Sequence, residues 1–157
     1  AVNVNVFGRN VAGEQGYTTI GIDGSDIRAA HGTATWSTVS DRRVKKDIED
    51  STAGLSFIND LRPRTFNFKN KGDLPKEFTG SYEEGSTEAY KNSKTQHGFI
   101  AQEVKEAIDN HSDITDGFKM WDVRDTGQQE VAEAALIPML VKAIQELSAE
   151  VEKLKGE

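Results

Sequence analysis

The stretch "STVSDRRVKKDI", residues 37–48, lies where the character of the chain changes. Residues 1–39 are glycine-rich and alternate apolar with polar side chains, whereas helical and strand patterns are mixed from residue 48 onward. Within the stretch, Ser40 directly precedes Asp41 and lies five positions before Lys45. The stretch has three interpretations: a solvated charge run, a nucleic-acid patch, or a serine beside its base.

The charge of the chain argues against a nucleic-acid partner. Its 19 Lys and Arg residues against 26 Asp and Glu residues give a net charge of −7. Neutralising phosphates requires a basic face. The basic run at residues 42–46 is interrupted by Val44 and followed by acidic residues. Charge alone therefore favours a solvated face for this run.

The composition also limits the chemistry. The absence of cysteine excludes disulfides, thiolate catalysis and cysteine-based zinc sites. His31, His97 and His111 lie far apart and do not show metal-ligand spacing, so we expect no metal and no cofactor. No apolar run approaches the roughly 20 residues of a membrane span, so no membrane partner is expected. The chain begins Ala-Val-Asn, and we expect it to be a piece of a longer protein.

Residues 1–39 are predicted to be β-rich. "AVNVNVF" alternates with the period of a strand, and Asp23-Gly24 between two β-prone runs predicts a hairpin turn. "GTATWSTV" is also typical of a strand. This segment is too short to close a β core alone. We expect it to pair with copies of itself or to end a longer β structure.

Residues 48–123 are predicted to contain short elements of both kinds. Ser51 and Thr52 are expected to cap a short helix whose apolar face carries Leu55, Ile58 and Leu61. "RTFNFKN" alternates as a strand, and residues 70–95 form a polar, glycine-spotted loop or weak hairpin. "GFIAQEVKEAIDN" predicts an amphipathic helix, and "FKMWDV" a buried strand.

The C-terminal segment has the clearest pattern. Apolar residues recur in steps of three and four, at Ile137, Leu140, Ile144, Leu147, Val151 and Leu154. Val141 and Ala143 widen this stripe, which favours more than two helices, whereas Ile or Val at a with Leu at d is typical of dimers. An amphipathic helix packed on its own domain is the alternative.

Ser40 and Lys45 are the candidate catalytic pair. A serine hydroxyl is a weak nucleophile until a base takes its proton, and a lysine is such a base only if burial or neighbouring cations lower its pKa. A spacing of five does not place two residues on one helix face, but a turn can bring them together. No nucleophile-elbow motif marks a Ser-His-Asp triad instead. The residues alone leave catalysis open, because serine near lysine is common.

Four segments resemble one family. "SDRRVKKDI" is similar to the SD-x-R-(L/V)-K-x-x-I signature of the intramolecular chaperone auto-processing domain, a self-cleaving peptidase module at the C-termini of phage tailspikes and tail fibres. "LRPRTFNFK", "HGFIAQEVKEA" and "ALIPMLVKAIQELSAEVEKL" resemble later family segments in the same order. His97 replaces the usual tyrosine of the third segment. The four segments cover residues 40–155.

The resemblance implies a homotrimeric chaperone that guides the folding of the upstream fibre of its own chain and then cuts itself off. Ser40 would be the nucleophile, Lys45 the general base and Val39–Ser40 the scissile bond. Asp41 and Arg43 would position the loop. The stripe at residues 137–154 would lie in the trimer. Cleavage that waits until assembly lowers the pKa of Lys45 is a further hypothesis.

The expected fold is therefore α+β and homotrimeric: a β-rich fibre end at residues 1–39, then a mixed chaperone domain at residues 40–157 with a long C-terminal helix. The resemblance implies assembly in the host-cell cytoplasm, with residues 1–39 remaining in the virion tail and the chaperone released. The alternatives are a structural or receptor-binding fibre tip that stays attached, and the equivalent self-cleaving module of a membrane-tethered transcription factor. A peptidase acting on other proteins lacks a substrate-binding feature in the sequence.

Overall fold

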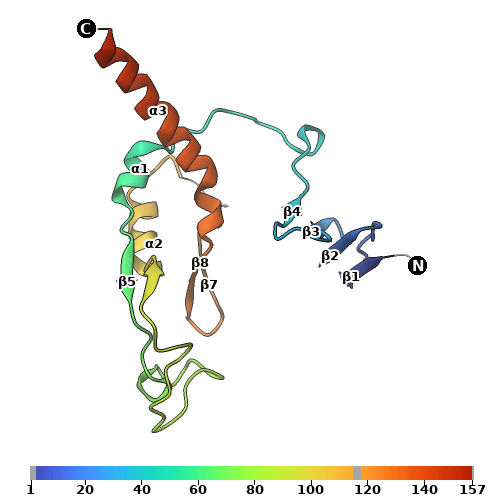
Figure 1. Ribbon diagram of the computed structural model, residues 1–157, viewed down its shortest axis with the longest axis vertical. Helices are drawn as coiled ribbons and strands as arrows, with labels where there is room; N and C mark the ends of the chain where they lie inside the picture. Colours follow the sequence, from blue (N-terminus) through green and yellow to red (C-terminus); the bar gives the residue numbers. More distant parts are fainter. Residues whose placement is uncertain (1–2, 115–117, 157) are drawn as a thin grey trace. The chain divides into compact units, whose positions relative to one another are not determined.

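The computed structural model describes residues 3–114 and 118–156 (Figure 1). The chain divides into two compact units, Ala1–Glu49 and Asp50–Glu157. The class is mixed α+β with a long C-terminal helix, as the sequence predicts. The division at residue 49 means that Ser40 and Lys45 belong to the same compact unit as the β-rich segment.

The first unit contains one four-stranded sheet, in which the strands follow one another in chain order. Strands β2 (Tyr17–Ile22) and β3 (Ser25–Ala30) pair antiparallel through the predicted turn at Asp23-Gly24, where Asp23 has a φ of 53°. This confirms the hairpin. Strand β4 (Ser37–Thr38) is short and adds antiparallel to β3. Strand β1 (Val4–Arg9) pairs parallel to β2, which the sequence did not predict. The first two residues of "AVNVNVF" lie outside the described part.

The first unit has almost no core of its own. Among its described residues, Thr19 is the only side chain that is buried. Polar contacts hold the strands together instead, such as the bonds that Arg9 and Asn10 donate to Asp23. Large apolar side chains remain exposed to solvent: Phe7, Ile20, Ile22, Ile27, Trp36 and Val39. The expectation that this segment cannot close a core alone is confirmed for the single chain.

The second unit has the core. Helix α2 (Ala101–Asp109) packs against helix α1 (Leu55–Asp60) and against the hairpin of β7 (Trp121–Val123) and β8 (Gln129–Val131). The buried cluster consists of Phe57, Leu61, Val104, Ala107, Met120 and Leu136. Phe57 is fully buried, although the predicted apolar face of α1 did not include it. The "FKMWDV" prediction was right about Met120, which is fully buried, but β7 itself is largely exposed.

An irregular excursion separates α1 from α2. Strands β5 (Arg64–Phe66) and β6 (Gln96–Gly98) pair antiparallel at its base. Between them, the chain forms one 3₁₀ turn, η2 (Lys71–Asp73), and an isolated bridge. The prediction of a long polar loop at residues 70–95 is confirmed.

Helix α1 is capped by a residue far away in the sequence. The backbone N–H of Leu55 donates to Glu146 Oε2 at 2.7 Å, and Glu146 lies on helix α3 (Ile137–Lys155). A Cβ on Gly54 would lie 2.5 Å from the same oxygen, so glycine leaves room for this carboxylate. The prediction that Ser51 and Thr52 cap the helix was wrong. Thr52 instead donates to Asp113 Oδ2 at 3.0 Å.

We expect Glu146→Ala to lower the free energy of unfolding by about 1–2 kcal/mol, because it leaves the first turn of α1 without its charged cap. Urea denaturation followed by circular dichroism at one protein concentration measures the loss. Glu150→Ala is the matched control, since Glu150 is an exposed glutamate on the same helix. Equal losses in the two variants would contradict a capping role for Glu146.

Candidate functional site

Ser40 and Lys45 lie in direct contact. Lys45 Nζ donates a hydrogen bond to Ser40 Oγ at 2.6 Å. The 3₁₀ turn η1 (Arg42–Val44) brings them together, and the N–H of Lys45 donates to the carbonyl of Arg42 to close it. The structure thus supplies the turn that a spacing of five requires.

Asp41 and Arg43 fix this turn. Asp41 Oδ1 accepts from the N–H of Arg43 at 2.8 Å and from Arg43 Nε at 3.0 Å, while Arg43 Nη2 donates to Oδ2 at 2.6 Å. The side-chain bond, followed by the backbone bond, lowers the pKa of Asp41, and the same pair raises the pKa of Arg43. Asp41 therefore stabilises the turn above its ordinary titration range. This contribution is lost as pH falls through the lowered pKa.

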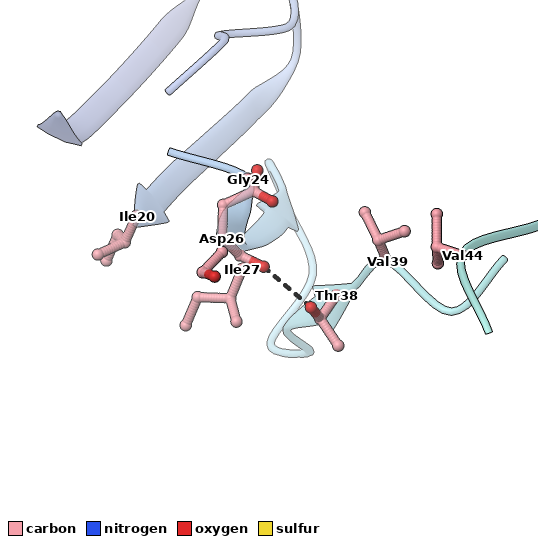
Figure 2. A pocket seen from close by; sticks show the side chains of 8 residues that line it. Ile20, Gly24, Asp26, Ile27, Thr38, Val39 and Val44 are labelled. Atoms are coloured by element: carbon pink, nitrogen blue, oxygen red, sulfur yellow. Dashed lines mark hydrogen bonds between the residues drawn. The ribbon is translucent and has the colours of Figure 1, made fainter. Parts of the chain in front are cut away.

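The residues before Ser40 are held by the sheet. Thr38 pairs with Ile27 in the β3–β4 ladder, and its Oγ1 donates to the carbonyl of Asp26 at 2.9 Å (Figure 2). Val39 follows at once and lines an open hollow of about 560 Å³. Figure 2 shows Val39 and Val44 on the same side of this hollow, whose apolar lining also includes Ile20 and Ile27.

The pair is open to solvent in the single chain. Ser40, Lys45 and the basic residues between them are exposed. A lysine ammonium in water keeps its proton, whereas burial favours the neutral amine that can act as a base. The contact between the Lys45 amine and the Ser40 hydroxyl is therefore in place, but neither side chain is buried in the single chain.

The part of the chain that the structure describes has no comparable site for the other candidate chemistry. Within residues 3–114 and 118–156, no group of His, Asp and Glu side chains is arranged to hold a metal ion. His111 Nε2 lies 2.7 Å from Asp60 Oδ2, and its ring meets the edge of Phe57, so it joins elements of the core. In the same ranges, no helix has both the length and the apolar character needed to cross a bilayer.

Helix α3 presents an apolar stripe to solvent. Pro138 lies in its first turn, and α3 packs against α1. The six predicted positions of the stripe are between 41% and 73% exposed: Ile137, Leu140, Ile144, Leu147, Val151 and Leu154. Ala143, which the sequence analysis added to this stripe, is instead buried within the chain. Of the two residues predicted to widen the stripe, only Val141 is exposed, so Val141 alone favours an assembly of more than two helices.

Residues 40–113 match a protein family described as chaperone of endosialidase. The match begins at Ser40 and includes Lys45, α1 and α2, but neither the β-rich sheet nor α3. No curated protein and no solved structure matches the chain.

Proposed function

We propose that the chain ends a β-rich phage tail fibre or tailspike, guides its assembly as a homotrimer and then releases itself. The match of residues 40–113 to the chaperone-of-endosialidase family supports this proposal. The upstream fibre of the same chain is the folding client. The chain is an enzyme in the single-turnover sense, a serine peptidase that cuts Val39–Ser40. The observation that carries this proposal is the contact of Lys45 Nζ with Ser40 Oγ at 2.6 Å, at the first residues of the family match.

The proposed reaction starts when neutral Lys45 takes the proton of the Ser40 hydroxyl. Ser40 Oγ attacks the carbonyl carbon of Val39, the C–N bond breaks, and the proton passes to the amino group of Ser40 as it leaves. The product is an ester between Val39 and Ser40 Oγ. Water then hydrolyses this ester to the Val39 carboxylate and the free Ser40 hydroxyl.

Assembly is proposed to supply the burial that the pair needs. The stripe of α3 and the coreless first unit both expose apolar surface that copies of the chain would cover. Burial of the exposed Lys45 side chain in such an assembly would favour its neutral form. Cleavage would then follow assembly.

The chaperone role predicts that refolding depends on an uncut chain. We expect the Ser40→Ala chain, diluted from urea, to recover its trimeric mass and β-sheet circular dichroism. The cleaved parent, treated identically, should recover neither for residues 1–39, because these residues have no core to guide their association. Equal recovery of the cut and uncut chains would contradict a chaperone role.

A further inference from the structure

We infer that Thr38 is a positioning residue through which the sheet holds the carbonyl side of the scissile bond, so that self-cleavage requires the β3–β4 pair. This inference rests on the proposed function and extends it. Thr38 does not touch the reacting atoms. It acts through Val39, the residue that separates it from Ser40.

The scissile bond lies between two anchors. On one side, Thr38 is held twice, by its ladder pairing with Ile27 and by the bond from its Oγ1 to the carbonyl of Asp26. On the other side, Asp41 holds the turn that carries Lys45. Between these anchors lie only Val39 and Ser40. The two anchors together therefore set where the Val39 carbonyl lies relative to Ser40 Oγ.

The hydroxyl of Thr38 matters because β4 is so short. This strand has two residues, Ser37 and Thr38, so few ladder bonds fix it. A single additional bond from Thr38 Oγ1 to β3 is then a large part of what holds it in place. An intramolecular attack is sensitive to small displacements of the reacting atoms, so a loosened β4 should slow cleavage.

The apolar hollow links the same parts of the molecule. Val39 and Val44, which lie on either side of Ser40 in the sequence, line it together with Ile20 of β2 and Ile27 of β3. The whole site belongs to the unit Ala1–Glu49, which carries the sheet. The proposed cleavage site is therefore positioned by residues 1–39, the segment that would stay with the fibre after cleavage. A chain in which β3 and β4 have not paired would stay uncut, so its chaperone domain would remain attached.

The test compares first-order cleavage rates after dilution from urea, followed by intact mass, with trimer formation checked by native mass. We expect Thr38→Val, which keeps the shape and removes the hydroxyl, to cut about fivefold more slowly than the parent, the equivalent of one hydrogen bond of ~1 kcal/mol. Thr38→Ser restores the hydroxyl and should restore the rate. Thr33→Val is the matched control, because Thr33 Oγ1 donates a similar bond to the carbonyl of Ala30 away from the dyad.

Three results would overturn the inference, and they differ in whether the proposed function survives. A parent that cuts, with Thr38→Val cutting at the parent rate, removes the role of Thr38 but keeps the proposed function. Equal slowing of Thr38→Val and Thr33→Val also removes it, since the effect would then belong to the sheet in general. A trimeric parent that never cuts removes both proposals.

Discussion

Ser40→Ala leaves the chain whole, and Lys45→Ala slows its cleavage by about a thousandfold or more, if the pair works as proposed. The alanine at residue 40 has no oxygen to form the ester with Val39. The alanine at residue 45 leaves the Ser40 hydroxyl without the group that lies 2.6 Å away. Intact mass at timed intervals after dilution from urea measures both effects.

Two further variants separate the base from mere positive charge. Lys45→Arg keeps a cation at the site, but a guanidinium does not give up its proton, so we expect cleavage to stay as slow as in Lys45→Ala. Lys46→Ala removes the neighbouring exposed lysine and should cut at the parent rate. A Lys45→Arg chain that cuts as fast as the parent would contradict the assignment of Lys45 as the base.

Leu147→Asp is expected to convert the proposed trimer into monomers. Leu147 lies in the middle of the α3 stripe and is 45% exposed in the single chain. In a helical trimer, the substitution would place three carboxylates together in an apolar seam, where each is costly to bury. We expect association to weaken by about a thousandfold or more, as measured by native mass and sedimentation across a concentration series.

The matched control for this variant is Ala149→Asp, which adds the same charge to an exposed position of the same helix outside the stripe. It should remain trimeric. The account also links the two activities, so monomeric Leu147→Asp should fail to cut Val39–Ser40. A monomer that cuts at the full rate would show that Lys45 needs no assembly to act as a base.

Local sequence patterns predicted the elements whose cause is local. The Asp23-Gly24 turn, the helix at Ala101–Asp109 and the C-terminal helix are each encoded by residues within or beside them. The cap of α1 was missed because Glu146 lies 91 residues from Leu55. No local pattern could show that contact. The parallel pairing of β1 with β2 was missed for a similar reason, since strand alternation does not specify a partner.

In the candidate site too, the sequence predicted the contacts between residues close in the chain and missed those with distant partners. The spacing of Ser40 and Lys45, with Asp41 and Arg43 between them, pointed to a turn that could join the pair. The bond from Thr38 to Asp26 had no signal in the sequence, because threonine in a strand is ordinary and its partner is a backbone carbonyl. The burial of Ala143 also could not be predicted, since a heptad pattern does not distinguish a face packed on α1 from one left free.

The most direct test of the central claim is the intact mass of the purified parent chain beside Ser40→Ala. The account predicts two fragments for the parent that divide between Val39 and Ser40, with masses that sum to the chain plus one water. Ser40→Ala should give one whole chain. A parent that stays whole while it is trimeric would contradict self-cleavage and favour a fibre tip that remains attached.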